Sequence, residues 1–518
     1  MNRRNTNLLD CTLRDGGYYN NWKFNKNLIN DYLKVISDYV DYVEIGFRFL
    51  DKDSSLGETA YTKSNFLKSI KKPKNVKLGV MINASDLIFY GNKNIPKVIK
   101  KIFPRKDPKI KFVRIACHSF EVEKILPAIS ILRKNYYVIV NIMQISELSE
   151  IIIKKVCKLL KNKISCLYIA DSLGSLTSKQ VIDKNNKIRK YWHGDLGMHA
   201  HDNMKNALDN TLTAVKHGFN WADGTILGMG RGAGNAKIED LIKKIKKRKT
   251  TNIDRLINNH FVNLKKKYKW GFNEFYNSAG KYKIHPTYIQ TILNDKRYKK
   301  FDYKKIINNL KEIDASRYNP NELMYSLFDR FTKKNIKTLN NINLGNQKKA
   351  LILGSNPNNL QNKKLLEDKI KKENYFVLAL NTTKHINEKL IDYRISSHPL
   401  RLTSEIENFR KTNSKIILPT GILPENILSR LDKKKLYFYN LIIKPNLIKI
   451  SKDFCILPSA ISIAFAIAIL IKFRFNYIEL SGFDLRKSSA DNTFDILKKM
   501  NKTKNKVAFK YLKNLNII

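Results

Sequence analysis

An alternation of short apolar segments with longer amphipathic segments runs from residue 8 to about residue 246, and it constrains the fold more than any other feature. The apolar segments have the length and composition of buried strands, and the segments between them have helical spacing. The expected strands are residues 8–12, 42–47, 77–83, 112–117, 137–143, 166–171, 196–201 and 221–227. Eight strand–helix units in roughly 240 residues match a (β/α)8 TIM barrel. A doubly wound sheet shows the same alternation but usually with fewer strands per domain, so we predict the barrel.

The strand pattern stops near residue 250 and resumes at residue 349. Helical, polar segments lie between, followed by a polar stretch without apolar periodicity, which is typical of a linker. We therefore predict an α/β protein with a barrel domain at 1–250, a helical extension at 251–332, a linker at 333–348 and a Rossmann-like three-layer α/β domain at 349–518. The expected strands of the last domain are residues 349–354, 376–380, 393–396, 415–418, 436–439 and 477–481.

The composition excludes several classes of protein. A hydrophobic fraction of 43% excludes wholesale disorder. The formal net charge of +52 would suit a polyanion, but the lysines are scattered along the chain, so we do not expect a nucleic-acid partner. Five cysteines without a CxxC pair indicate a reducing compartment. The apolar stretch at 460–471 is too short to cross a bilayer, so we expect a buried helix, no membrane span and a cytoplasmic protein.

Three motifs fall at the ends of expected barrel strands, where barrel active sites form. The first is TLRDGG at residues 12–17, which places a guanidinium beside a carboxylate. The second is MHAHD at 198–202, in which His199 and His201 share one face of a strand because residues two apart point the same way. The third is GMGRGAGN at 228–235, whose glycines allow close backbone approach to a ligand.

Together, Asp15, His199 and His201 would give one oxygen and two nitrogen donors and leave coordination positions open. Such a set suits Lewis-acid chemistry on a carbonyl group. Because no cysteine is needed, a harder divalent cation fits. We expect Mn²⁺, with Mg²⁺ or Co²⁺ as alternatives.

The three motifs, in this order and at these strand ends, resemble the metal-dependent TIM-barrel lyase superfamily of hydroxymethylglutaryl-CoA lyase, the isopropylmalate and homocitrate synthases and 4-hydroxy-2-oxovalerate aldolase. The glycine motif and the helical extension are most similar to the last, and the resemblance covers about residues 6–330. It implies that Asp15, His199 and His201 bind the metal and that Asn235 approaches it. It also implies that Arg14 stabilises the enolate oxygen of the substrate.

Further residues would line the substrate site. The resemblance implies that Ser172 contacts the keto-acid carboxylate and that Tyr276 lies near the substrate hydroxyl. Glu44, at the end of its strand, could orient Arg14 by a charge-assisted hydrogen bond or form a routine barrel ion pair. Arg231 stands in a loop that is usually rich in small residues and could recognise an anionic group. We expect His285 to anchor the helical extension.

One position departs from the aldolases, which place a histidine shortly after RDG to take the proton of the substrate hydroxyl. Tyr18 stands there in this sequence. A phenol has an unperturbed pKa near ~10, against ~6.5 for an imidazole, so it is a poorer base at neutral pH. The enolate half of the chemistry is intact, and the aldehyde half depends on whether Tyr18, or a metal-bound water, replaces the histidine.

The last domain carries two turn motifs of its own. LILGSNP at 351–357 is a strand entering a turn of the kind that binds phosphate, and YIELSGFDL at 477–485 is a second strand ending in Gly482 and Asp484. Over these two motifs the domain resembles Rossmann-like domains of bacterial sialyltransferases and of hydroxymethylpterin-pyrophosphokinase-like proteins. The resemblance implies a nucleotide or nucleotide-sugar ligand; a purely structural module is the alternative.

The sequence therefore predicts a metal-dependent aldolase that cleaves or forms a 4-hydroxy-2-oxoacid through a metal-bound pyruvate-type enolate. Its partners would be a 2-oxoacid and an aldehyde, in a surface-glycan or small-molecule biosynthetic pathway, and a homo-oligomer is compatible with the sequence. One alternative is an acyl-CoA-dependent condensing enzyme of the isopropylmalate or homocitrate synthase type. Another is a non-catalytic scaffold or polyanion-binding protein.

Overall fold

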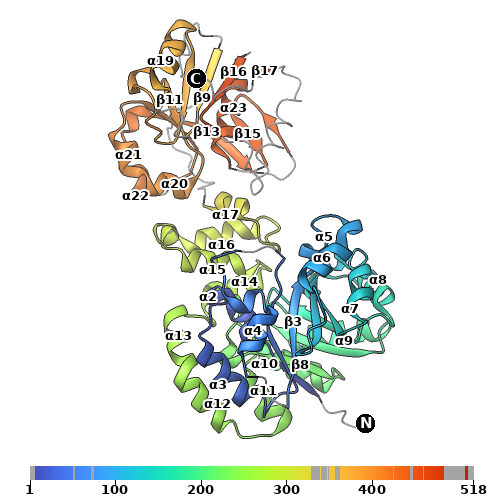
Figure 1. Cartoon of the computed structure of the whole chain (residues 1–518). Helices are drawn as coiled ribbons and strands as arrows, with labels where there is room; N and C mark the ends of the chain where they lie inside the picture. Colours follow the sequence, from blue (N-terminus) through green and yellow to red (C-terminus); the bar gives the residue numbers. More distant parts are fainter. Residues whose placement is uncertain are drawn as a thin grey trace. The chain divides into compact units, whose positions relative to one another are not determined.

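The structure is a computed structural model that describes residues 6–50, 53–71, 75–327, 339, 347, 349–355, 362–423, 425–443, 447–458, 460–475, 477–483 and 508–510. The chain divides into two compact units, residues 1–291 and 292–518 (Figure 1). Most of the predicted linker at 333–348 lies outside the described residues.

The first unit contains the predicted closed barrel of eight parallel strands in sequential order. The strands are β1 (Asn7–Asp10), β2 (Tyr42–Phe47), β3 (Lys77–Asn83), β4 (Ile110–Cys117), β5 (Tyr137–Ile142), β6 (Cys166–Asp171), β7 (Asp195–Ala200) and β8 (Trp221–Gly224). The strands β2, β3 and β6 have the predicted bounds. Apolar segments of this length, separated by helices, therefore identified the barrel correctly.

Two expected barrel strands end two or more residues earlier than the sequence suggested. The strand β1 ends at Asp10 because the Oδ1 atom of Asp10 accepts a hydrogen bond from the backbone N–H of Thr12, at 2.8 Å, and turns the chain. The motif TLRD then forms the short helix α1 (Thr12–Asp15) rather than closing the strand. The strand β8 ends at Gly224, and the backbone beyond it turns through Leu227 at φ 51°.

Helices follow the barrel strands along the chain. Those of the first unit are α1 (Thr12–Asp15), α2 (Gly17–Asn20), α3 (Lys26–Ile36), α4 (Ser64–Ser69), α5 (Ala84–Ile88), α6 (Ile95–Ile102), α7 (Leu126–Leu132), α8 (Glu150–Leu160), α9 (Ser178–Arg189), α10 (Ala207–Lys216), α11 (Ile238–Leu241), α12 (Thr251–Leu256), α13 (Val262–Tyr268) and α14 (Glu274–Lys281). The helix α15 (Pro286–Asn294) spans the boundary between the units, and α16 (Tyr303–Lys311) and α17 (Pro320–Ser326) follow it.

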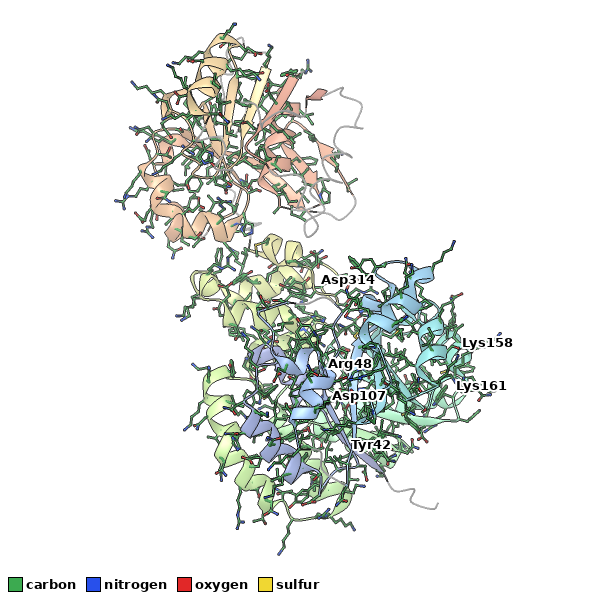
Figure 2. The ribbon with its side chains drawn as sticks, viewed as in Figure 1. Tyr42, Arg48, Asp107, Lys158, Lys161 and Asp314 are labelled. Carbon is green, nitrogen blue, oxygen red and sulfur yellow. The ribbon has the colours of Figure 1, made fainter. Side chains whose placement is uncertain are left out.

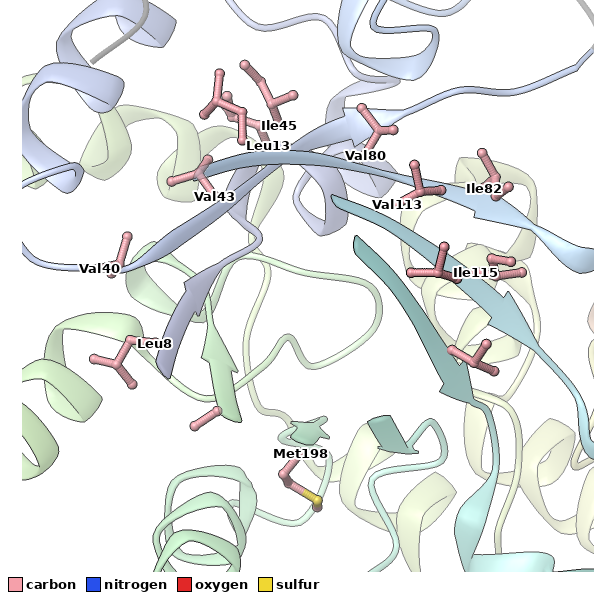
Figure 3. Packing of buried hydrophobic residues seen from close by; sticks show 14 of the residues in the cluster. Leu8, Leu13, Val40, Val43, Ile45, Val80, Ile82, Val113, Ile115 and Met198 are labelled. Carbon is pink, nitrogen blue, oxygen red and sulfur yellow. The ribbon is translucent and has the colours of Figure 1, made fainter. Parts of the chain in front are cut away.

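Alternate residues of the barrel strands belong to two separate cores. Val43, Val80 and Val113 are among the strand residues that face the surrounding helices in the larger core (Figure 3). A second cluster fills the barrel interior with aromatic side chains, including Tyr42, Phe112, Tyr168 and Trp221. Side chains of a strand point to the same side at every second residue. Residues two positions after these aromatic residues therefore also point into the barrel, and they form a polar layer nearer the carboxyl ends of the strands.

The positive charge lies largely on the outside of the molecule. Lys158 and Lys161 at the end of α8 are exposed and point outward, whereas Arg48 and Asp107 form a buried ion pair of 3.1 Å (Figure 2). No helix of the described residues is long and apolar enough to cross a membrane.

The second unit contains a nine-stranded mixed sheet with the order β14-β15-β13-β12-β11-β10-β9-β16-β17. All described pairs are parallel except β14 with β15. The strands are β9 (Lys349–Leu353), β10 (Phe376–Leu380), β11 (Tyr393–Ile395), β12 (Lys415–Pro419), β13 (Leu436–Ile443), β14 (Lys449–Ile450), β15 (Phe454–Leu457), β16 (Tyr477–Ser481) and β17 (Ala508–Lys510). The sequence did not predict β14, β15 or β17.

Helices cover both faces of this sheet. Leu351 and Leu353 of β9 pack with α19 (Lys363–Lys372), while Ala350 and Ile352 pack in the core that contains α23 (Ser462–Lys472). The predicted buried apolar helix is α23, whose residues from Ile463 to Ile471 are all buried. The remaining helices are α20 (Pro399–Ser404), α21 (Ile406–Lys411) and α22 (Glu425–Leu428). Of the two turn motifs, residues 356–357 and 484–485 lie outside the described residues.

Candidate metal centre

The helix α1 places Arg14 and Asp15 at the carboxyl ends of the barrel strands. Both side chains are buried, and the Nη1 atom of Arg14 donates to Oδ1 of Asp15 at 2.6 Å. Because the chain turns at Asp10 instead of continuing as a strand, these adjacent residues point into the barrel mouth together. The early end of β1 therefore brings the two charged groups of TLRDGG to one site.

His199 lies on β7, and His201 follows the end of that strand on the same face. Their ring centroids are 5.0 Å apart, and both residues are 3% exposed. His201 forms an isolated antiparallel β-bridge with Asn235, whose Nδ2 atom donates to Oδ2 of Asp15. The glycine loop thus returns to the site and places Asn235 beside the predicted ligands.

The structure brings the predicted metal ligands together. One side-chain donor atom from each of Asp15, His199 and His201 lies within 4.8 Å of the others, in a fully buried group. Burial raises the pKa of Asp15, but the charge of Arg14 helps to outweigh it and to hold this pKa well below the usual range. Burial, and then the charge of Arg231, lowers the pKa of His201. The group therefore contains an ionised carboxylate and, at His201, a neutral imidazole, which are the protonation states that bind a metal.

Two orphaned atoms support a cation at this position. Nδ1 of His201 and Oδ1 of Asn235 are buried without a hydrogen-bond partner within the part of the chain that the structure describes. A buried polar atom without a partner is costly, and a metal ion would satisfy such lone pairs. The residues present thus fit a divalent cation.

A chain of buried ion pairs surrounds this group. The Nε atom of Arg14 donates to Glu44 at 2.6 Å, and Glu44 also accepts from Arg114 at 2.7 and 2.8 Å. Arg114 donates to Asp223 at 2.6 Å, and Asp223 contacts Nδ1 of His199 at 2.9 Å.

The chain of ion pairs closes on itself, because Nε2 of His199 lies 3.6 Å from Oδ2 of Asp15. Burial raises the pKa of Glu44 and of Asp223, but their cationic partners outweigh it and lower both values. We refer to Arg14, Asp15, Glu44, Arg114, His199 and Asp223 as the charged ring.

Arg114 and Asp223 were not predicted as site residues from the sequence. The signal was present, because each lies two residues after an aromatic residue of the barrel interior: Phe112 precedes Arg114, and Trp221 precedes Asp223. Charged residues at inward positions of otherwise apolar strands need partners on neighbouring strands.

A second group of possible metal ligands is Cys11, His199 and Asp223. Here Asp223 already accepts from Arg114 and His199, and the thiol of Cys11 lies 3.5 Å from the carbonyl of Gly224. This group therefore lacks orphaned donor atoms, and we take Asp223 as the partner that orients His199.

The glycine loop packs against the site through two residues. A Cβ atom on Gly230 would lie 2.8 Å from both Oδ2 of Asp15 and Nδ2 of Asn235. Gly234, at φ 87°, has no room for a side chain, because its Cβ would lie 1.9 Å from the carbonyl oxygen of Gly228. The glycines thus let the loop approach the carboxylate of Asp15.

Ser172 and Arg231 lie at the mouth of the barrel. The hydroxyl oxygen of Ser172 accepts from the backbone N–H of Gln144 at 3.2 Å, and its carbonyl accepts from Arg231 at 3.3 Å. The Nη1 atom of Arg231 is 3.0 Å from Nε2 of His285. His285 therefore holds Arg231 directly before α15.

The two predicted catalytic tyrosines have different surroundings. Tyr18 is 36% exposed, and the guanidinium carbon of Arg231 lies 6.0 Å from its ring centroid. Burial of its hydroxyl raises the pKa of Tyr18, and the charge of Arg231 does not outweigh this effect. Tyr276 is buried, and its hydroxyl lies 3.3 Å from that of Tyr19, which donates to the carbonyl of Gly232. The roles of both residues remain predictions.

By its fold and its site, the protein is a (β/α)8 barrel with a candidate metal centre, which buried carboxylate and imidazole groups form at the ends of the strands. The chain belongs to the HMGL-like family, whose model matches residues 5–267, just over half of the chain.

Several known proteins are similar to the barrel part of the chain. An oxaloacetate decarboxylase from Mycobacterium tuberculosis is 24% identical over 250 residues, which are 46% of this chain and 70% of that protein. A 4-hydroxy-2-oxovalerate aldolase from Carboxydothermus hydrogenoformans is 26% identical over 246 residues, again 46% and 70%. The crystal structure of the N-terminal domain of a candidate aldolase from Bacteroides vulgatus is 28% identical with a TM-score of 0.52, and the match covers 58% of this chain and 99% of that domain.

Proposed function

We propose that the barrel is a divalent-metal-dependent carbon–carbon lyase that cleaves or forms a 4-hydroxy-2-oxoacid. The observation that carries this proposal is the partly paired guanidinium of Arg14. Its Nε and Nη1 atoms are bound to Glu44 and Asp15, whereas its buried Nη2 atom has no partner among the described residues. A fixed cation with a spare donor beside a metal centre is suited to stabilise a developing oxyanion. The similarity to 4-hydroxy-2-oxovalerate aldolases supports the substrate class.

In this proposal Asp15, His199, His201 and Asn235 hold the metal. When bound, the metal would act as a Lewis acid on the keto and carboxylate oxygens of the substrate. Asp223 fixes the tautomer of His199 by accepting the hydrogen of Nδ1, which leaves Nε2 as the ligand atom. Mn²⁺ is our first choice, with Mg²⁺ and Co²⁺ as alternatives.

The chain's own residues would divide the remaining work. In the cleavage direction the hydroxyl at C4 would give its proton to a water molecule, the C3–C4 bond breaks, and the electron pair of that bond forms an enolate as the aldehyde leaves. Arg14 donates Nη2–H to the enolate oxygen, and the enolate then gains a proton at C3 to become pyruvate. Ser172 donates its hydroxyl hydrogen to the substrate carboxylate, since its oxygen already accepts from Gln144.

Tyr18 would act as a hydrogen-bond donor and not as the base. Its raised pKa keeps the phenol protonated at neutral pH, so it can orient a hydroxyl or a water molecule but cannot readily accept a proton. Tyr276 is the second candidate for the residue that orients the substrate hydroxyl or a water molecule, although its own hydroxyl already contacts that of Tyr19.

The protonated state of Tyr18 favours a second candidate, the decarboxylation of a 2-oxoacid with a carboxylate at the position of the aldol carbon. This reaction forms the same enolate and releases carbon dioxide, and it needs no base for a substrate hydroxyl. The similarity to an oxaloacetate decarboxylase supports it. The two candidates differ in product, an aldehyde or carbon dioxide.

We further propose that the second unit is a Rossmann-like module that binds a nucleotide or a nucleotide sugar. Its first strand, β9, has β10 on one side and β16 on the other, so the strand order reverses at β9. Ligands of open α/β sheets bind beyond the carboxyl ends of the strands at such a reversal. Thermal shift measurements with nucleotides and nucleotide sugars test this proposal, and unfolding transitions that none of them moves would contradict it.

The lyase proposal is tested by incubating the purified protein with Mn²⁺ and 4-hydroxy-2-oxoacids or oxaloacetate, with product analysis by mass spectrometry. We expect pyruvate together with either an aldehyde or carbon dioxide, and loss of turnover after chelation. A requirement for coenzyme A would indicate the condensing enzyme instead. An absence of turnover with every substrate, together with tight, salt-dependent binding of polyanions, would support the scaffold alternative.

A further inference from the structure

Arg231 differs from the three buried arginines of the barrel, Arg14, Arg48 and Arg114, in its partners. Its contacts are Nε2 of His285 at 3.0 Å, the carbonyl oxygen of Ser172 at 3.3 Å and the ring of Tyr18. All three are uncharged. Within the described part of the chain, no carboxylate forms an ion pair with this guanidinium, although its side chain is half-buried.

The buried arginines of the described chain all pair with carboxylates. Arg14 pairs with Asp15 and Glu44, Arg114 pairs with Glu44 and Asp223, and Arg48 pairs with Asp107. In the second unit the buried Arg394 pairs with Glu388. Removing a guanidinium from water without a counter-ion is unfavourable, so the charge of Arg231 calls for an anion from outside the described chain.

The position of Arg231 indicates where that anion would lie. It directly follows Gly230, on which a Cβ atom would lie 2.8 Å from Oδ2 of Asp15, one of the candidate metal ligands, and its guanidinium carbon lies 6.0 Å from the ring centroid of Tyr18. An arginine is always protonated and can only donate, so Nε2 of His285 accepts and this imidazole is neutral. His285 therefore orients the guanidinium without neutralising it, next to the candidate metal centre.

From this geometry we propose that Arg231 binds a second anionic group of the substrate, so that the substrate is a 2-oxoacid with an additional carboxylate beyond C1. This inference rests on the proposed lyase function and specifies its substrate class. Arg14 serves the keto oxygen and Ser172 the first carboxylate, which leaves Arg231 for the distal group. Arginine suits this role because its planar fork binds a carboxylate through two parallel hydrogen bonds.

The test compares substrates that differ only at the distal end. We compare 4-hydroxy-2-oxoglutarate with 4-hydroxy-2-oxovalerate, which carry a carboxylate and a methyl group at the same position. The variant is Arg231→Met, which keeps the length of the side chain, with Arg231→Lys as the conservative variant. Arg133→Met, which removes an exposed arginine from the outside of the barrel, is the matched control.

We expect the parent protein to prefer the dicarboxylate. Arg231→Met should lose about 10–100-fold in kcat/KM for the dicarboxylate, mainly through KM, because a hydrogen-bonded charge pair is removed. The monocarboxylate should change less than about threefold. Arg231→Lys should recover part of the preference, and Arg133→Met should behave like the parent. Equal losses on both substrates, or no loss on either, would overturn the inference.

A binding experiment separates this inference from the lyase proposal. Calorimetric titration of the Mn²⁺-loaded protein with 2-oxoglutarate and 2-oxovalerate measures the distal carboxylate without any turnover. A preference for 2-oxoglutarate that Arg231→Met abolishes supports the inference even if no 4-hydroxy-2-oxoacid is cleaved, in which case only the lyase proposal fails. Equal affinities in the parent protein contradict the role of Arg231 whatever the lyase assay gives.

Discussion

Replacing Asp223 by asparagine tests the charged ring most sharply. The Oδ1 atom of Asp223 lies 2.9 Å from Nδ1 of His199, and Oδ2 lies 2.6 Å from Nη1 of Arg114. An amide of the same shape has one accepting oxygen, so Asp223→Asn must direct an N–H group at either the imidazole or the guanidinium. One hydrogen bond is lost, and the buried Arg114 keeps only Glu44 as its counter-ion.

The expected magnitude follows from these contacts. Loss of the carboxylate that orients a metal-binding histidine typically weakens metal affinity by about 10–100-fold. At about 1.4 kcal/mol per tenfold, this corresponds to roughly 1.4–2.8 kcal/mol. Stability should fall by about 1.5–3 kcal/mol, the contribution of a hydrogen bond to a charged group.

The assay is calorimetric titration with Mn²⁺ alongside thermal unfolding. The matched control is Asp107→Asn, which disrupts the buried Arg48–Asp107 pair but shares no residue with the charged ring. We expect the control to destabilise the protein and leave Mn²⁺ affinity unchanged. If Asp223→Asn binds Mn²⁺ as tightly as the parent, or if both variants weaken binding equally, the proposed orientation of His199 is wrong.

Three further predictions follow from single contacts. Arg14→Ala should retain Mn²⁺ affinity within a few-fold, whereas its turnover rate should fall by about 10²–10³-fold, because the Nη2 donor that is available to the enolate is lost. Proton exchange into pyruvate at the parent rate would refute this role. Tyr18→Phe should slow aldol cleavage by about 10–100-fold while pyruvate still exchanges its methyl protons, as NMR in deuterium oxide can measure; cleavage at the parent rate would make Tyr18 a packing residue. Glu239→Gln should flatten the pH dependence of stability, because burial raises the pKa of Glu239 from 4.5 to about 7. A carboxyl group with a raised folded-state pKa stabilises the fold below pH 4.5 and loses that contribution as pH rises to about 7. In chemical denaturation at pH 8 the variant should therefore be more stable than the parent by on the order of 3 kcal/mol. Equal stability at pH 8 would contradict the buried, protonated state of Glu239.

The sequence alone was sufficient for the barrel and for the group at its mouth. Parallel strands buried on both faces appear as apolar runs, which is why β2, β3 and β6 have the bounds expected of them. Asp15, His199 and His201 were recognisable because barrel topology brings the carboxyl ends of distant strands together. Local hydrogen bonds were not visible in the pattern, so the turn made by Asp10 and the helix of TLRD after it were missed.

Other features depend on which strands become neighbours. In the sequence, Arg114 and Asp223 are isolated charged residues within apolar segments. Only in the closed barrel do they form hydrogen bonds with each other, with Glu44 and with His199. The short strands β14 and β15 carry little periodicity of their own and are defined by pairing with each other and with β13. The raised pKa of Tyr18 is likewise a property of the folded site, because burial determines it.

The measurement that tests the central claim most directly is metal-dependent enolisation. The rate at which the methyl protons of pyruvate exchange with deuterium oxide is followed by NMR, with and without Mn²⁺, in the parent protein and in His199→Ala. We expect exchange that requires Mn²⁺, stops on chelation and is lost in His199→Ala, since in the proposed mechanism the metal ligands and Arg14 together form the enolate site. An exchange rate that is the same without metal, or unchanged in His199→Ala, would contradict the account.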